Sequence, residues 1–189
     1  MLDVKSRLCV KNLLQVREFQ VPATYRETND REKKSLALFS YLRFCLANQP
    51  ELAHIQTAYA NSAANIAAGQ SAVRLDSIEP LTTRLESLVL TTVATAAREA
   101  LAAFEHTLAE DDALLAANRF DDSNVRNCVV QRRGEKQVLH WWIALAEHCI
   151  PLLAMQWNEL RKRASEHLSA SARDHYVTHV VAVLVKRGA

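Results

Sequence analysis

Residues 138–160 read VLHWWIALAEHCIPLLAMQWNEL and hold all three tryptophans of the chain. The apolar residues of this stretch recur every three or four positions, which is the period of one face of an α-helix. That stripe consists of Trp142, Leu145, Cys149, Leu152 or Leu153, Trp157 and Leu160. Pro151 removes a backbone hydrogen bond and crowds the carbonyl of residue 147, so it predicts a kink or the start of a new helix. The stripe favours the core of a helical bundle.

The same stretch also allows an alternative, a pocket. His140 and Glu147 lie seven positions apart and therefore share another face of the helix, as do Trp141 and His148. A kink that frees a carbonyl beside these side chains could open a small site there. The alternative pocket thus consists of His140, Trp141, Glu147 and His148, and the bundle core remains the favoured interpretation.

Composition predicts an all-α fold. The 189 residues include only 3 glycines and 4 prolines, which β-sandwiches and barrels need for their turns. The longest helix is expected over residues 80–110, with Ser77 as its cap and Pro80 in its first turn. Its stripe is Leu85, Val89, Val93, Ala97, Leu101, Phe104 and Leu108.

Further helices are predicted on both sides of this segment. One runs from Asn29 or Asp30 to Ala47, and another restarts at Asn48, Pro50 and Glu51. Short helices are expected near Asp111 and after Asp122 or Ser123, and Gly134 is expected to separate the second of these from the tryptophan-rich helix. A last helix is expected over residues 170–188. The prediction is a single compact bundle of about seven to eight helices in one domain, 1–189, with residues 1–30 as a loosely packed N-terminal arm.

Metal binding has a weak signal. His175 and His179 lie one helical turn apart, as two ligands of one metal would, but there is no H-E-x-x-H motif and no third ligand of known register. The aspartate pairs 111–112 and 121–122 could bind Mg²⁺, but each precedes a predicted helix, where aspartate caps free amides. We therefore predict no metal and no cofactor, and keep the His175/His179 pair as the alternative.

Charge and cysteine usage restrict the class of partner. A net charge of +2 is too small for the dense basic surface that nucleic acid requires. The four cysteines form no C-x-x-C pair, and no apolar run reaches the 18 or so residues of a membrane span. A reducing cytosol is the expected location, either that of the producing cell or one into which the protein is delivered.

The sequence has no G-x-S-x-G motif and no glycine-rich phosphate loop, so it favours a non-catalytic role. We predict an α-helical protein–protein interaction module of the adaptor, regulator, immunity or secretion-accessory type. Its last helix is more apolar than a terminal helix needs, which predicts either a central position or burial against a protein partner or a second copy. The predicted partner surface is Val177, Val181, Leu184 and Val185. The alternative is a small metal- or small-molecule-binding helical enzyme that uses the Trp141–His148 region and the His175/His179 pair.

Overall fold

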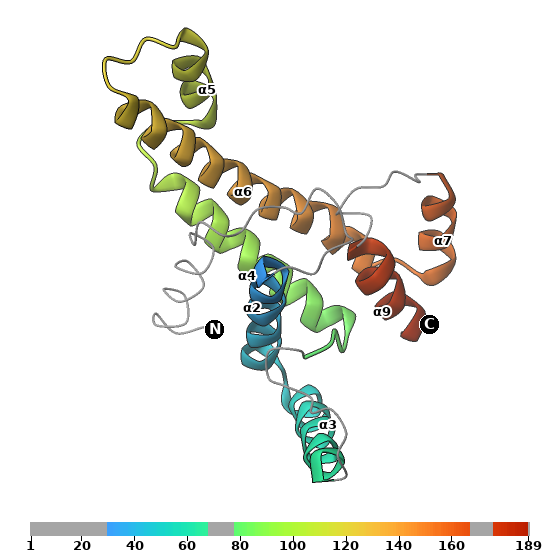
Figure 1. The fold of residues 1–189 in the computed structure, drawn as a ribbon. Helices are drawn as coiled ribbons and strands as arrows, with labels where there is room; N and C mark the ends of the chain where they lie inside the picture. Colours follow the sequence, from blue (N-terminus) through green and yellow to red (C-terminus); the bar gives the residue numbers. More distant parts are fainter. Residues whose placement is uncertain (1–29, 68–77, 167–175, 189) are drawn as a thin grey trace.

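The computed structural model describes residues 30–67, 78–166 and 176–188, and every regular element in these ranges is a helix (Figure 1). The predicted all-α class is confirmed. The N-terminal arm expected over residues 1–30 lies almost entirely outside the described residues. The elements are α2 (Asp30–Leu46), α3 (Gln49–Ala67), α4 (Thr83–Ala102), α5 (Leu108–Ala117), α6 (Ser123–Leu153), α7 (Trp157–Glu166), the π-helical turn η2 (Val177–Val181) and α9 (Ala182–Arg187).

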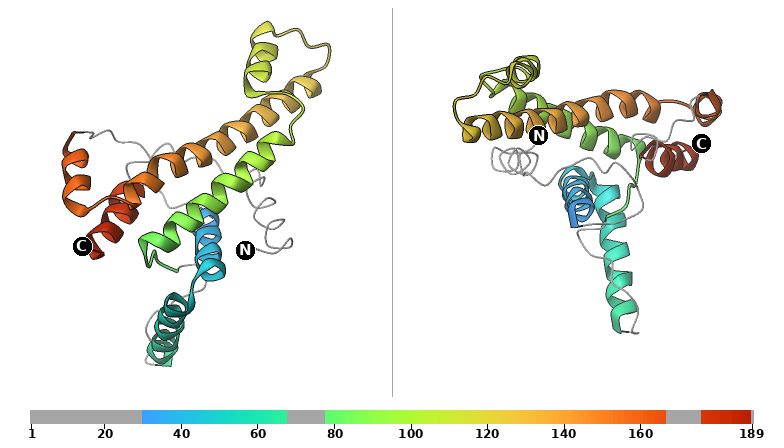
Figure 2. Two further views of the ribbon diagram at one scale, coloured as in Figure 1. Left: turned by 180° about the vertical axis from the view of Figure 1, so that it is seen from behind. Right: turned by 45° about the horizontal axis from the view of Figure 1, so that its top comes forward.

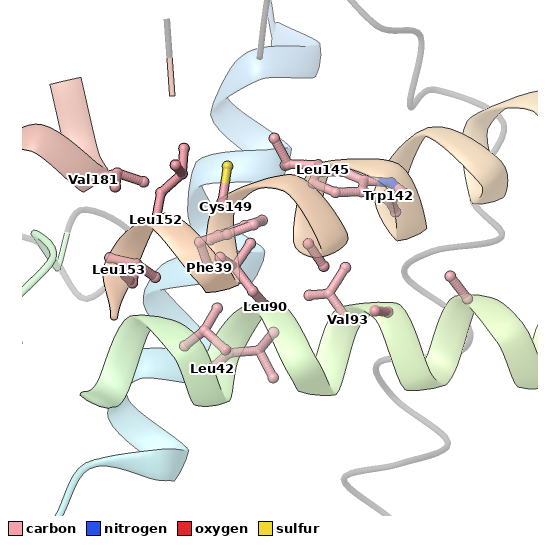
Figure 3. Packing of buried hydrophobic residues seen from close by; sticks show 14 of the residues in the cluster. Phe39, Leu42, Leu90, Val93, Trp142, Leu145, Cys149, Leu152, Leu153 and Val181 are labelled. Atoms are coloured by element: carbon pink, nitrogen blue, oxygen red, sulfur yellow. The ribbon is translucent and has the colours of Figure 1, made fainter. Parts of the chain in front are cut away.

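Two antiparallel helices, α4 and α6, form the centre of the fold and lie side by side in every view (Figures 1 and 2). Helix α2 packs across α4, while η2 and α9 pack against α6. The side chains between them form one hydrophobic core, in which Phe39 of α2, Leu90 of α4 and Cys149 of α6 meet (Figure 3). Trp142 is buried in this core, and Trp157 of α7 packs against it half-buried.

The longest helix is α6, with 31 residues, and the prediction that residues 80–110 would form it was wrong. Helix α4 begins at Thr83, because the Thr82 side chain accepts the backbone N–H of Leu85, and it ends after 20 residues at Ala102. A new helix then starts at Leu108, where Thr107 and Glu110 form a reciprocal capping box. The apolar period continues across the break, but the capping groups end one helix and begin another.

Gly134 does not divide α6, contrary to the prediction. A glycine inside a helix costs about 1 kcal/mol relative to alanine, and the packing of α6 along both α4 and α5 offsets a cost of that size. Asp122 caps α6 as predicted, since its carboxylate accepts the N–H of Asn124. The helix continues two residues beyond Pro151, and α7 begins after a short break at Trp157.

A buried polar network joins α2, α4 and the C-terminal helix. The Arg43 guanidinium donates to both oxygens of the Glu86 carboxylate, at 2.9 and 2.7 Å, and to the carbonyl of Ile78 at 2.7 Å. The Tyr176 hydroxyl donates to the same carboxylate. Burial, followed by the negative charge of Glu86, raises the pKa of Tyr176 well above its ordinary value, so the phenol keeps the proton that it donates.

The turn η2 follows Tyr176 directly. The N–H of Ala182 bonds to the carbonyl of Val177, five residues back, so this turn contains one residue more than an α-helical turn. In a regular α-helix five residues turn the chain about 140° past one full revolution. The additional residue reduces that angle, and Tyr176 and Val181 can therefore both face the core side.

Candidate binding surface

The residues predicted as a partner surface lie largely inside the fold. Val181, Leu184 and Val185 are 0%, 2% and 5% exposed, and Val177 is half-buried against the same core. The central position, one of the two alternatives drawn from the valine-rich sequence, thus accounts for their burial. Contact of these four residues with a partner stays a prediction.

The four residues of the alternative pocket are divided between solvent and core. His140, Glu147 and His148 are exposed on α6, whereas Trp141 is half-buried and packs edge-on against Trp142 with ring centroids 4.7 Å apart. Glu147 accepts a hydrogen bond from Arg98 of α4 at 2.8 Å. The structure therefore brings Glu147 to an arginine of the neighbouring helix, and a ligand pocket at these positions stays a prediction.

Of the predicted metal pair, His179 is exposed on η2 and His175 lies outside the described residues. Within the described ranges no group of three or more histidine, cysteine, aspartate or glutamate side chains could hold a metal ion. The His175/His179 pair stays a prediction.

A cluster of buried charges joins α5 to α6. Lys136 Nζ donates to Asp111 Oδ2 at 2.6 Å, and their side chains are 1% and 0% exposed. Arg132 Nε donates to the other oxygen, Asp111 Oδ1, at 2.9 Å. Lys136 also donates to the carbonyls of His106 and Thr107, which immediately precede α5. We call Asp111, Arg132 and Lys136 the ionic clamp.

The sequence had suggested Asp111 as a helix cap, and this was wrong, because Thr107 caps α5 and Asp111 faces α6. Burial alone raises the pKa of the Asp111 carboxyl, but the hydrogen bonds from Arg132 and Lys136 outweigh burial and lower it overall. The pKa of Arg132 is raised, mainly by its hydrogen bond to Asp111. Asp111 therefore stays ionised and holds two cations from α6.

The clamp sets the register of an antiparallel hairpin. Residues 106 and 107 lie beside Lys136, while Asp111 lies beside Arg132 and Asp112 forms an ion pair with Arg133. The two helices are therefore antiparallel, and the C-terminal end of α5 lies near the N-terminal end of α6. The clamp thereby fixes the position of this end of the hairpin.

Beyond the clamp, the apolar contact between α5 and α6 is incomplete. Leu114 follows Asp111 by three residues, and Val125 precedes Arg132 by seven, so both project from the sides of their helices that face each other. Nevertheless they are 44% and 54% exposed. Leu115 and, in the connecting loop, Phe120 are half-buried beside them. We call Leu114, Leu115, Phe120 and Val125 the hairpin end.

A family model matches a large part of this chain. Residues 5–139 match the family described as Rubisco LSMT substrate-binding. No curated protein and no solved structure matches the chain. None of the helices in the described ranges is both long and apolar enough to cross a membrane.

The matched region contains the ionic clamp and the hairpin end, whereas α7, η2 and α9 lie beyond it. It also extends over well more than half of the 189 residues. The chain therefore belongs to the Rubisco LSMT substrate-binding family.

Proposed function

We propose that this protein is an α-helical module that binds a protein substrate through the hairpin end, and that it has an adaptor rather than a catalytic role. The family description names substrate binding, and Rubisco is itself a protein. The observation that carries the proposal is that Leu114 and Val125 lie beyond the clamp, on the sides of α5 and α6 that face each other, and are still 44% and 54% exposed. A partner side chain that covers them would bury apolar surface that the chain itself leaves open.

The ionic clamp makes this surface suitable for binding. Binding costs less when the contact residues are already held in place, because fewer side chains and loops must be ordered on association. Asp111 and Lys136 are fully buried and hydrogen-bonded one to two turns from Leu114. An apolar centre with a polar rim is also the usual anatomy of a protein interface, and the residues next to Phe120 in the chain, Asn118, Arg119 and Asp121, are polar and exposed.

The cytosolic location predicted from the sequence belongs to the same proposal. Cys45 and Cys128 are exposed free thiols. Disulfides persist mainly in oxidising compartments, so free exposed cysteines support a reducing one.

The test compares two double variants of the full chain. Leu114→Gln with Val125→Gln removes apolar surface from the hairpin end, and glutamine preserves helix propensity. The control, Leu88→Gln with Val130→Gln, removes the same type of surface at positions that are 38% and 44% exposed elsewhere on α4 and α6. Exposed substitutions of this kind change stability by about 0.5 kcal/mol or less each, so both variants should fold.

Each protein is immobilised and incubated with a soluble lysate of the producing organism, and retained proteins are quantified by mass spectrometry. We expect a protein that wild type and control retain and the hairpin-end variant loses. If the two double variants retain the same proteins in the same amounts, the hairpin end is not the contact surface.

A further inference from the structure

The arginine and lysine side chains of this protein differ in how their charge is balanced. Within the region that contains α2, α4, α5 and α6, six cations have a carboxylate partner, and only the exposed Arg119 and Arg126 have no side-chain partner among the described residues. The six paired cations are Arg43, Arg84, Arg98, Arg132, Arg133 and Lys136. Among the side chains described in this part of the molecule, positive charge is thus largely neutralised.

Cations without carboxylate partners gather where α7 packs against α9, at the end of the molecule away from the hairpin (Figures 1 and 2). Arg161, Lys186 and Arg187 are exposed, and none of them forms an ion pair or side-chain hydrogen bond with the described part of the chain. Lys162 is exposed as well. Glu159 is the one acidic residue among the side chains described in these two helices. We call Arg161, Lys186 and Arg187 the basic end.

Helix stabilisation accounts for part of this charge. Lys186 and Arg187 lie in the last turn of α9, where cations interact favourably with the helix dipole. Arg161 and Lys162 lie in the middle of the ten-residue α7, where that effect has faded. The dipole therefore explains the position of two of the cations and not of the others.

The outward face of α9 also carries apolar surface. Val183 is 37% exposed and lies one turn before Lys186 and Arg187, so the three side chains share a face. The other face of α9 is buried through Leu184 and Val185. A carboxylate-bearing peptide that contacts Lys186 and Arg187 could cover Val183 at the same time.

We propose that the basic end binds an acidic segment of the protein substrate, as a second contact besides the hairpin end. This inference rests on the proposed function. Complementary charge steers association and fixes the orientation of a partner. A protein segment fits better than nucleic acid, since a few cations in a chain of net charge +2 are far from a dense phosphate-binding surface. Because α7 and α9 lie beyond residues 5–139, this contact would add to what the family-matched region provides.

The test uses the purified full chain and a fluorescein-labelled peptide of ten glutamates. The variant Arg161→Glu with Arg187→Glu reverses two charges of the basic end. The control, Gln49→Glu, Gln56→Glu, Ala60→Glu and Gln137→Glu, adds four negative charges at exposed positions outside both proposed contact surfaces and so changes the net charge by the same amount. Binding is followed by fluorescence anisotropy at low and physiological salt, and circular dichroism confirms that both variants are folded.

We expect the basic-end variant to weaken peptide binding by tenfold or more, and the control by less than twofold. Equal losses would mean that only net charge matters, and absence of binding to wild type would also overturn the proposal. So would tighter binding of a ten-nucleotide thymidine oligomer or of phosphatidylserine vesicles, because the surface would then serve nucleic acid or lipid.

The lysate experiment separates this inference from the proposed function. If the basic-end variant retains the partner that the hairpin-end variant loses, the basic end is not a contact surface and the hairpin end stands. If wild type retains no protein that depends on the hairpin end, the proposed function itself fails, whatever the peptide measurement shows.

Discussion

Replacing Asp111 by asparagine should destabilise the protein far more than breaking an exposed ion pair. The substitution keeps the shape of the side chain but removes the charge that faces Lys136 Nζ at 2.6 Å and Arg132 Nε at 2.9 Å. Lys136, with 1% of its side chain exposed, would then be a buried cation without a carboxylate. Removing one partner of a buried ion pair typically costs about 3–5 kcal/mol, because the remaining charge stays desolvated.

The magnitude can be checked against a second substitution. Lys136→Met removes the buried cation, and the double variant Asp111→Asn with Lys136→Met leaves neither charge in the interior. Arg132, whose side chain is 30% exposed, can then turn to solvent. Replacing both members of a buried pair by neutral groups is often close to neutral, so the double variant should be clearly more stable than the sum of the two single losses predicts.

The assay is urea unfolding followed by far-UV circular dichroism. Urea unfolding gives the loss of about 3–5 kcal/mol directly as a change in the free energy of unfolding. In a thermal melt of the same variants, a loss of this size corresponds to a fall in melting temperature of roughly 6–20 °C for a domain of this size. The matched control is Glu147→Gln, which breaks the Arg98–Glu147 pair at 2.8 Å between side chains 53% and 61% exposed and should cost about 1 kcal/mol or less. If Asp111→Asn is no more harmful than the control, or the double cycle is additive, the clamp does not hold the hairpin as argued.

Three more outcomes are expected. Burial raises the pKa of Asp111 and of Glu51, but hydrogen bonds outweigh burial and lower both pKa values overall. The stability that these carboxylates contribute is therefore complete above their unfolded pKa of about 4 and is lost as the pH falls through the lower folded values. Urea midpoints measured between pH 6 and 2.5 should consequently fall less steeply for Asp111→Asn than for wild type. Trp142→Ala should cost about 3–5 kcal/mol in urea unfolding, and unchanged stability would show that the indole is not a core residue. Tyr176→Phe removes one donor from the buried Glu86 carboxylate and should cost about 1–3 kcal/mol, whereas an unchanged thermal melt would show that this bond contributes nothing.

Apolar periodicity predicted the helices well but not where they end. The stripe from Leu85 to Leu108 is continuous in sequence, although α4 ends at Ala102 and α5 starts at Leu108. What decides the break is partly local, in the capping box of Thr107. It is also partly distant, because Lys136 donates to the carbonyls of His106 and Thr107, which lie 30 and 29 positions earlier in the chain. The apolar pattern of one segment carries no information about a hydrogen bond to a residue so far along the chain.

The buried charges were missed for a similar reason. The sequence predicted that the acidic run containing Asp111 precedes a helix and caps it, whereas Asp111 lies inside α5 and its two partners lie on α6. A signal did exist at Lys136, which lies seven residues after Val129 and three before Leu139, so it interrupts a buried face of α6. A cation in such a position needs a carboxylate, and Asp111 was available in the neighbouring helix.

The excess of valine in the last helix predicted either a central position or burial against a partner. Sequence could not decide between the interior and a partner, because both remove valine from water. The structure places Val181, Leu184 and Val185 in the core and leaves Val183 outside with Lys186 and Arg187. The proposed contact on this helix is consequently made by residues next to those that the valine pattern singled out.

Both proposed contact surfaces are held by buried ionic or polar groups at opposite ends of the α4–α6 pair. The clamp at Asp111 positions the hairpin end, and the bond from Tyr176 to Glu86 anchors the helix that carries Lys186 and Arg187. Buried ion pairs contribute little net stability, but they are sensitive to geometry and can select one arrangement of packed helices. Asp111→Asn should therefore weaken partner binding together with stability, whereas Arg161→Glu with Arg187→Glu should weaken binding while the melting temperature stays close to wild type. A clamp variant that melts early and still binds normally would mean that the hairpin is ordered by its partner rather than in advance.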